Sequence, residues 1–296
     1  MSLDDRLRLA SLGLHPTRVQ TLLAEWDGAK AVLRAIERGR VKVGDGIRDR
    51  LAVDAVAEAA NAGAIVIVRE DLPAALAGLP DAPDLVYVRG NLPAAPGVAI
   101  VGSRAATSYG RKLARALGRA AAERGWVVVS GLARGIDGEA HRGCLEGGGV
   151  GVAVLGCGLD VTYPVEHGDL ATSLVENGGA LVSEYAPGTP PAPWRFPPRN
   201  RIISGLAGVT VVVEASVKGG ALITAARALE QGRTVLAVPG DVQRATSRGC
   251  NMLIRDGAYP VLDVDDFITS LTFVLGLPPK TADAGLAVSE EGGNDA

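Results

Sequence analysis

The sequence has little cysteine and no long apolar run, and each shortage argues against a class of protein. The three cysteines, Cys144, Cys157 and Cys250, are spaced neither as disulfide pairs nor as metal ligands. No apolar stretch reaches the roughly 20 residues that span a membrane, and the first residues lack the apolar core of a secretory signal. We therefore expect a cytoplasmic protein that contacts no membrane.

The acidic net charge conceals an uneven distribution of charge along the chain. The formal net charge is −3, but residues 256–296 carry eight acidic side chains and one basic one, so this end has a charge of −7. Residues 1–255 hold the other 29 basic and 25 acidic side chains, a charge of +4. A basic body is compatible with a polyanionic partner, although it does not require one.

The order of the apolar patterns predicts a small helical domain followed by a sheet. Residues 1–60 show helical spacing and resemble the sterile-alpha-motif or helix-hairpin-helix class; a helical cap without a site is the alternative. The sheet domain, 61–277, alternates helical segments with β-branched runs expected as strands at 64–68, 85–89, 97–102, 126–131, 150–156, 180–184, 209–215 and 234–240. Such runs are buried on both faces, which indicates an α/β fold with a mainly parallel sheet between helices. The acidic tail, 278–296, is expected to be disordered.

Five of the expected strands end in glycine-bearing loops that carry basic side chains. In a parallel sheet these loops open onto one edge, where ligands bind. Several precede helices, whose first N–H groups lack partners and favour anions. The basic residues of the loops are Arg104, Arg134, Lys218, Arg244 and Arg248. We therefore expect a site for phosphate-bearing ligands at this edge; the alternative is that the glycines only serve tight turns.

Signatures of nucleotide cofactors and of catalysis are missing from the same loops. Neither the G-x-G-x-x-G spacing of a dinucleotide site nor a G-x-x-x-x-G-K-[ST] motif occurs in the expected context, so we expect no cofactor. Asp137 and His141 stand four residues apart on an expected helix, but no third metal ligand accompanies them, and a structural hydrogen bond is the simpler interpretation. Glu184 and Glu214 follow strands, where they can cap loops. We therefore expect no catalytic residue and no metal site.

The segment FPPRNRIISGLAG, residues 196–208, is basic and has no acidic residue near it. The range 185–213 contains Arg195, Arg199 and Arg201 but neither Asp nor Glu. Arginine presents a planar fork of donors that suits phosphate, and the ring of Phe196 can stack on a base. An exposed turn whose arginines cap a helix is the alternative. Because alternate positions near a helix start need not face the same way, one of Arg199 and Arg201 is also open to a structural role.

Taken in order, the motifs of residues 83–258 resemble the DNA processing protein A (DprA/Smf) family of single-stranded DNA-binding recombination mediators. The matching segments are VGSR with YG (101–110), SGLARGIDGEAH (130–141), VLGCGLDVTYP (154–164), SEY (183–185), FPPRNRIISGLAG (196–208), VVVEASVKGGALITAARALEQGR (211–233), AVPG (237–240) and GCNMLIRDGA (249–258). The resemblance implies an extended Rossmann-like central domain, often preceded by a sterile-alpha-motif-like domain and followed by a winged helix. This sequence departs from the family at residues 218–221, where two hydroxyls are lost, and after Leu277, where we expect no winged helix.

The resemblance also implies which residues bind single-stranded DNA. They are Gly102, Ser103, Arg104, Phe196, Arg199, Asn200, Arg201, Lys218, Gly219 and Gly220, with Arg134, Arg244 and Arg248 as further basic residues of the pocket. The basic side chains would hold phosphates, glycine amides at a helix start would add donors, and Phe196 would either stack on a base or pack into the pocket wall. The family further implies a homodimer, joined through the Rossmann-like domain, that protects incoming DNA and loads the RecA recombinase in natural transformation and recombination.

An enzymatic function stays open as a second hypothesis. Residues 218–230 have a faint likeness to the P-G-G-x-G-T-x-x-E loop of lysine-decarboxylase-like nucleoside monophosphate phosphoribohydrolases, in which a glutamate acts on the glycosidic bond. Here Glu230 or Glu214 would take that role, although the G-T-x-x-E spacing is absent. A small-molecule carrier that uses the same loops is a third, weaker alternative.

Overall fold

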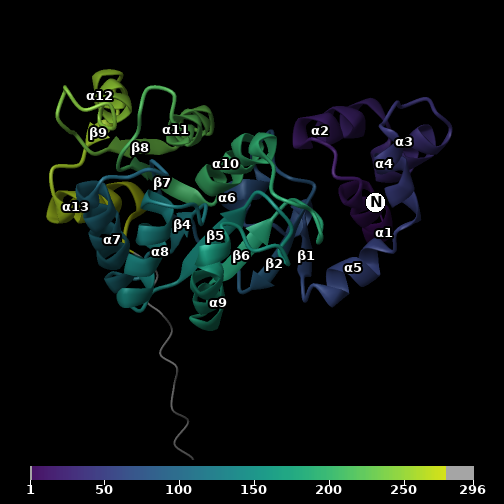
Figure 1. The fold of residues 1–296 in the computed structure, drawn as a ribbon, viewed down its shortest axis with the longest axis horizontal. Helices are drawn as coiled ribbons and strands as arrows, with labels where there is room; N and C mark the ends of the chain where they lie inside the picture. Colours follow the sequence, from purple (N-terminus) through teal and green to yellow (C-terminus); the bar gives the residue numbers. More distant parts are fainter. Residues whose placement is uncertain (1, 278–296) are drawn as a thin grey trace, which may run out of the picture.

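The computed structural model describes residues 2–277, and its centre is a nine-stranded sheet with helices on both faces (Figure 1). The strands are β1 Ile65–Val68, β2 Leu85–Gly90, β3 Gly97–Val101, β4 Val128–Ser130, β5 Gly151–Leu155, β6 Ala180–Ser183, β7 Ala207–Val212, β8 Thr234–Ala237 and β9 Tyr259–Pro260. β2 pairs antiparallel with β1 and β6, whereas all other neighbouring strands are parallel. The prediction of a mainly parallel sheet is confirmed, with β9 as a short strand that the sequence pattern missed.

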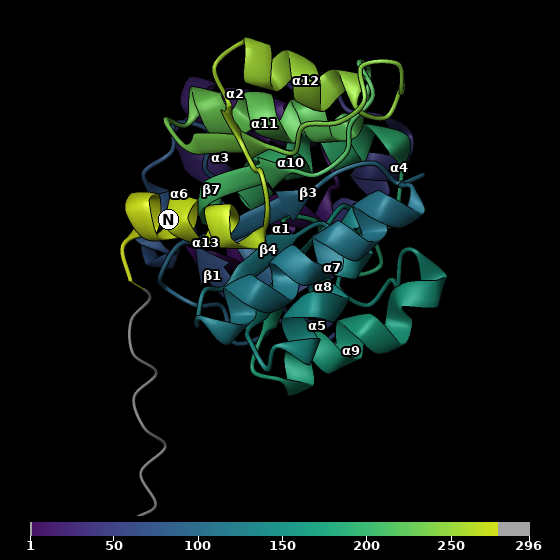
Figure 2. The ribbon, with the colours of Figure 1, turned by 90° about the vertical axis from the view of Figure 1, so that its left-hand side faces the viewer.

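Two sets of helices cover the two faces of the sheet (Figure 2). The helices α6, α10, α11 and α12 pack on one face, and α5, α7, α8, α9 and α13 on the other. Their bounds are α5 Ala55–Asn61, α6 Ala74–Ala77, α7 Ser108–Glu123, α8 Ile136–Glu146, α9 Gly168–Glu176, α10 Phe196–Gly205, α11 Gly220–Glu230, α12 Arg248–Arg255 and α13 Val264–Leu275. Because strands such as β3 are buried along their whole length, their apolar residues form continuous runs without alternation.

The first part of the chain forms a helical unit at the β1 end of the sheet (Figure 1). It contains α1 Leu3–Ser11, α2 Pro16–Glu25, α3 Gly28–Glu37, α4 Asp45–Arg48 and the 3-10 turn η1 Asp49–Ala52; the other 3-10 turns are η2 Arg69–Asp71, η3 Val165–His167 and η4 Pro193–Arg195. The unit has an apolar core of its own, which includes Leu9, Leu22, Val32 and Ile36. The helices expected in residues 1–60 are therefore confirmed.

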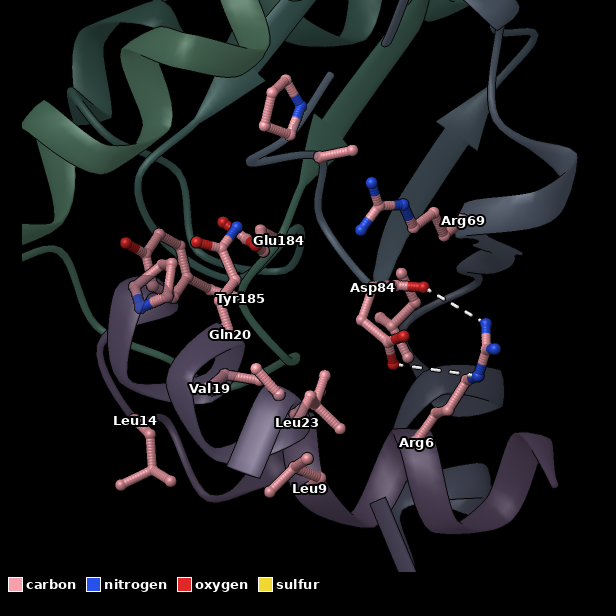
Figure 3. Close-up of a pocket in the computed structure, with 16 residues that line it drawn as sticks. Arg6, Leu9, Leu14, Val19, Gln20, Leu23, Arg69, Asp84, Glu184 and Tyr185 are labelled. Atoms are coloured by element: carbon pink, nitrogen blue, oxygen red, sulfur yellow. Dashed lines mark hydrogen bonds and ion pairs between the residues drawn. The ribbon is translucent and has the colours of Figure 1, made fainter. Parts of the chain in front are cut away.

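The helical unit is joined to the sheet by a buried arginine. Both Nη atoms of Arg6 donate to the carboxylate of Glu70, at 2.6 and 2.5 Å, and its Nε lies 3.8 Å from Asp84. These hydrogen bonds lower the pKa of Glu70 to about 2. Beside this contact lies a cavity of about 340 Å³, where apolar side chains of α1 and α2 face polar groups of the sheet domain (Figure 3).

The connections between strands create one point at which a ligand can enter. From β3 the chain adds β4, β5 and β6 on one side and then returns to place β7, β8 and β9 on the other. The loops after β3 and β7 therefore diverge, and such switch points open a crevice at the carboxyl edge of a parallel sheet. On one side of this crevice, α7 and α8 approach very closely, because a β-carbon at Gly118 or Gly143 would collide with the backbone of the other helix.

The last two expectations concern the acidic tail and contact with a membrane. The acidic tail, 278–296, lies outside the described residues. Within residues 2–277, no helix is both long and apolar enough to cross a bilayer.

Candidate nucleic-acid interface

A cleft of about 500 Å³ lies at the switch point between β3 and β7. The loop after β3, the start of α8, helix α10 and the start of α11 form its walls. Eight of the residues expected to bind DNA line it, namely Gly102, Ser103, Arg104, Phe196, Arg199, Asn200, Gly219 and Gly220. The structure thus brings together the three segments on which the sequence-based hypothesis depends.

Arg199 is a buried cation with incomplete pairing. Its side chain lines the cleft and is 3% exposed, and its Nε and Nη1 atoms have no hydrogen-bond partner. Burial lowers the pKa of Arg199 to about 10, an effect that the charge of Asp137 opposes. A β-carbon at Gly131 would collide with the guanidinium, so only glycine leaves room for it there. Arg199 therefore brings an incompletely paired positive charge to the wall of the cleft.

The ring of Phe196 contacts both a cation and another aromatic ring. The guanidinium of Arg104 sits 4.6 Å from its centroid, and the ring of Tyr163 lies 5.5 Å away at an angle of 33°. Arg104 is exposed, and no carboxylate of residues 2–277 lies within ion-pair distance of it. The contact is a cation–π interaction at the surface, which is worth about 0.5–1 kcal/mol and is readily exchanged.

Two helices begin at the cleft without a side-chain cap. α11 has Gly219 as its N-cap, α8 has Gly135, and neither N-cap accepts a hydrogen bond through a side chain. Gly135 has φ of +75°, and a β-carbon there would collide with the carbonyl oxygen of Ser103. The first N–H groups of a helix carry a partial positive charge and bind anions. At α8 the N–H groups of Ile136 and Gly138 already donate to the carbonyl oxygens of Ser103 and Ala133. The start of α11 therefore supplies the backbone donors that accompany the guanidinium groups of Arg104 and Arg199 in the cleft.

The structure corrects the expectation that Arg201 faces the same site. Its Nη1 and Nη2 atoms donate to the two carboxylate oxygens of Glu184, at 2.8 and 2.7 Å, and Nε lies 3.7 Å from Asp81. The side chain is buried and does not line the cleft. Residues 199 and 201 lie on one helix, so they point about 200° apart. The alternative of an exposed turn is also wrong, because both arginines are buried in α10.

The other four basic candidates lie outside the main cleft. Arg134 is exposed, forms an ion pair with Glu166 and lines a smaller hollow that also touches Phe196. Lys218 faces a shallow hollow on the outer side of α11. Arg244 pairs with Asp241 at 3.7 Å, and Arg248 is exposed at the start of α12. None of these four side chains lines the cleft.

The acidic candidates are engaged in structural contacts. Glu214 accepts hydrogen bonds from the backbone N–H of Thr107 at 2.9 Å and from its hydroxyl at 2.5 Å, which confirms that it caps a loop. Glu230 pairs with Arg227 on the exposed surface near the end of α11.

The Asp137 carboxylate accepts from Gly131 N–H, while His141 is fully buried with both ring nitrogens unpartnered. The hydrogen bond expected between Asp137 and His141 is thus not formed. Among residues 2–277, no three His, Cys, Asp or Glu side chains gather as metal ligands would.

Sequence reasoning missed several residues of the cleft. Thr224 and Ser216 line it, and Asp137 supplies a buried negative charge beside Arg199. The spacing of Gly220 and Thr224, four residues apart, is a signal that could have placed the threonine hydroxyl on the same face of α11. Leu132, which follows Gly131, has a φ of +55°, and its carbonyl oxygen accepts a hydrogen bond from Nδ1 of His167 at 2.9 Å. Nothing in the sequence pattern indicated that contact.

Comparison with known proteins gives consistent matches. The family model described as DNA recombination-mediator protein A matches residues 63–272. Protein Smf of Escherichia coli is 46% identical over 208 residues, which are 70% of this chain and 56% of that protein. DNA processing protein DprA of Streptococcus pneumoniae is 42% identical over 209 residues, 70% of this chain and 73% of that protein. The chain thus spans little more than half the length of the E. coli relative.

Two solved structures are similar over most of their length. The X-ray structure of DNA processing protein A from Streptococcus pneumoniae has a TM-score of 0.75 at 33% identity and covers 91% of this chain and 98% of that one. The Helicobacter pylori protein has a TM-score of 0.64 at 28% identity and covers 72% of this chain and 98% of that one. The latter structure is described as giving insight into the single-stranded DNA binding mode of the H. pylori protein.

Proposed function

The chain belongs to the DNA recombination-mediator protein A family, and on this basis we propose that it binds single-stranded DNA in the cleft between β3 and β7. The observation that carries the proposal is Arg199, an incompletely paired buried cation that lines a cleft where α11 begins without a side-chain cap. A phosphate of the DNA backbone would balance this charge and accept from the helix start. Arg104 and the Gly220 amide would contribute to the same contact, with Asn200 beside them, whereas the Gly219 N–H already donates to the carbonyl oxygen of Ser216.

Single strands are favoured over duplex because the cleft offers a ring as well as cations. A base would stack on Phe196 in place of the guanidinium of Arg104, which would then be free to pair with a phosphate. Bases in a duplex are already stacked on each other and cannot make this exchange without unpairing. Sequence preference should be weak, since every base has a face that can stack.

The cleft itself supports the non-enzymatic interpretation more than the enzymatic one. Glu214 is fully engaged with Thr107, and Glu230 lies near the opposite end of α11 from the cleft. Neither carboxylate is available to act on a glycosidic bond next to a phosphate held by Arg199. The phosphoribohydrolase hypothesis therefore loses the two residues on which it depended.

The binding proposal is tested by fluorescence anisotropy with a labelled oligo-dT of about 20 nucleotides at about 50 and 200 mM salt. Wild type should bind the single strand more tightly than a duplex of equal length, and its affinity should fall steeply with salt. Arg104→Ala and Arg199→Met should both weaken binding. Each lost phosphate contact should also reduce the slope of log K against log salt concentration by about 0.7. Arg124→Ala removes an exposed charge at the end of α7 and serves as the control. Equal binding by wild type and both cleft variants would overturn the assignment.

We further propose that the chain acts in the cytoplasm as a homodimer that protects incoming DNA and loads the RecA recombinase during transformation and recombination. The description of the family as a recombination mediator supports this role. A dimer through the sheet domain is supported by exposed apolar side chains near its β9 end, namely Tyr259, Leu262, Phe273 and Leu277. Exposed apolar patches of this kind mark interaction surfaces. A monomeric mass in light scattering would contradict the homodimer. If the protein does not accelerate RecA filament formation on DNA that it coats, the proposed loading of RecA is contradicted.

A further inference from the structure

An exposed tryptophan stands beside the cleft, just before α10. Trp194 belongs to η4, and the prolines on either side of the Trp194–Phe196 segment, Pro193 and Pro197, both line the cleft. The residue is 43% exposed, whereas Trp126 is 4% exposed. Tryptophan supplies a large, rigid contact area with one polar group, and such side chains are enriched at interfaces.

The indole of Trp194 is held in place by rings from two other parts of the chain. The ring of His15, the N-cap residue of α2, stacks on it with centroids 5.7 Å apart and planes 28° apart. The ring of Tyr185, which follows β6, meets it edge-on at 6.5 Å and 87°. The aromatic surface is therefore preorganised, and the helical unit contributes part of it through His15.

The neighbouring arginine has no negatively charged partner. The guanidinium of Arg195 lies 4.5 Å from the centroid of Trp194 and 5.6 Å from that of Tyr185. Its Nη1 atom donates to the carbonyl oxygen of Pro190, and its Nε atom is buried without a partner. Among the side chains that the structure describes, no carboxylate lies within ion-pair distance of this guanidinium. A cation beside an exposed aromatic ring is an arrangement that binds single-stranded nucleic acids.

We propose that His15, Trp194 and Arg195 form a second nucleotide subsite, which continues the cleft toward the helical unit. A base next to those in the cleft stacks on the His15–Trp194 pair, and Arg195 neutralises the phosphate that follows it. This inference rests on the proposed function, because the same strand occupies both places. It gives the helical unit a direct part in DNA binding through His15.

The length of the oligonucleotide separates this subsite from the cleft. An oligo-dT of about 6 nucleotides and one of about 20 are compared by anisotropy with wild type, Trp194→Ala and Trp194→Phe. Trp194→Ala should weaken binding of the long strand about fivefold or more, in line with the loss of one base stack, and leave the short strand nearly unchanged. Trp194→Phe keeps a ring and should restore most of the long-strand affinity. His15→Ala should resemble Trp194→Ala, with a smaller effect.

The charge of Arg195 and the stacking of the base are tested separately. Arg195→Ala should reduce the salt dependence of long-strand binding by about 0.7, whereas Arg124→Ala should leave it unchanged. In wild type, the long strand should quench tryptophan fluorescence, and this quenching should be missing in Trp194→Phe. Circular dichroism confirms that each variant is folded.

The two proposals fail in different ways. If wild type binds neither oligonucleotide, or Arg104→Ala and Arg199→Met both bind the short strand as wild type does, the proposed binding in the cleft is refuted. If Arg104→Ala loses both strands but Trp194→Ala and Arg195→Ala bind the long strand like wild type, the cleft stands and the second subsite is refuted. A Trp194→Ala variant that binds DNA normally but fails in RecA loading would instead assign this surface to a protein partner and also refute the subsite.

Discussion

Arg199 and Arg201 show how strongly position on a helix decides the role of a residue. They are two residues apart in α10, yet one lines the cleft with an incompletely paired guanidinium and the other is paired with Glu184 and Asp81. In the sequence the two look alike, since the acid-free range begins at residue 185 and leaves out Glu184 by a single position. The helical turn, rather than the composition of the segment, separates the DNA-binding candidate from the structural one.

Replacing each arginine by methionine should separate these roles. Arg201→Met keeps the apolar volume but leaves Glu184 and Asp81 without their cation, so it should lower the free energy of unfolding by about 3 kcal/mol. Arg199→Met also leaves the buried carboxylate of Asp137 without its neighbouring cation, but it removes an incompletely paired charge at the same time, so its loss should be smaller, about 1–2 kcal/mol. Urea unfolding measures both values. DNA affinity should respond in the opposite order, with Arg199→Met impaired; a stability loss that is larger for Arg199→Met would contradict this assignment.

Buried His141 should make the stability of the protein depend on pH. Burial lowers the pKa of His141 to about 3, below the value of about 6.5 in an unfolded chain. Between these values the unfolded chain binds a proton that the folded protein does not. The free energy of unfolding should therefore fall as the pH decreases from 6.5 toward 3, by up to about 1.4 kcal/mol per pH unit for this group.

The leucine variant isolates the contribution of His141 from that of the carboxylates. His141→Leu cannot bind the proton in either state, so its stability should decline less than that of wild type between pH 7 and 5. Urea unfolding at several pH values gives the difference between the two proteins. Parallel curves across this range would show that His141 is not the group responsible.

At the scale of elements, the strands were predictable and helix α10 was not. Continuous β-branched runs identify buried strands of a parallel sheet, and all eight expected strands occur. Helix α10 begins with Phe-Pro-Pro and continues with Arg-Asn-Arg, a composition that resembles a loop more than a buried helix. Proline is nevertheless favourable in the first turn, where its missing N–H has no intrahelical partner. Strand β9 was not predicted because it consists of only two residues, both of them exposed.

The uncapped start of α11 gives a prediction in which stability and binding change in opposite directions. Gly219→Asp and Gly219→Asn both supply a side-chain cap and reduce the freedom of the unfolded chain, so each should raise the free energy of unfolding by about 0.5 kcal/mol. The backbone there has φ of −74° and ψ of 143°, which other residues adopt without strain, although a β-carbon would lie 3.1 Å from Ser216 O.

The aspartate should affect DNA binding more than the asparagine. Both caps occupy an N–H group at the start of α11, but only the aspartate brings a negative charge to face the phosphate, so its affinity should fall about tenfold below that of the asparagine variant of nearly equal shape. Thermal unfolding and anisotropy measure the two effects. If both variants bind DNA equally well, the start of α11 is not a phosphate contact.

At the scale of the whole molecule, the position of the cleft could be predicted from the sequence better than the residues that line it. The carboxyl edge of the sheet and the three segments that meet there follow from the strand order and the glycine-bearing loops. Ion pairs between distant positions could not be predicted in this way. Arg201 depends on Asp81, and the helical unit depends on Arg6 with Glu70; such partners are set by the tertiary fold and leave no local pattern.

The uneven charge of the chain should affect DNA binding at long range. Residues 278–296 carry four acidic side chains and Lys280, so their removal changes the formal net charge from −3 to 0. We expect the shortened chain to bind oligo-dT about two- to fivefold more tightly at 10 mM salt, where the Debye length is about 30 Å, and equally at 1 M, where it is about 3 Å. Anisotropy titrations test this, with a tail of equal length and neutral amides as the control. A difference that persists at 1 M salt would mean that the effect is not electrostatic.

The close approach of α7 and α8 has a mechanical consequence for the cleft. Because backbone meets backbone at Gly118 and Gly143, the two helices cannot slide past each other without a collision, and they should move as one stiff body. The loops after β3 and β4, which precede these helices, share that stiffness. We therefore expect any widening of the cleft for a nucleotide to come from the side of α10 and α11, so that amide hydrogen exchange in α11 should report DNA binding more strongly than exchange in α7.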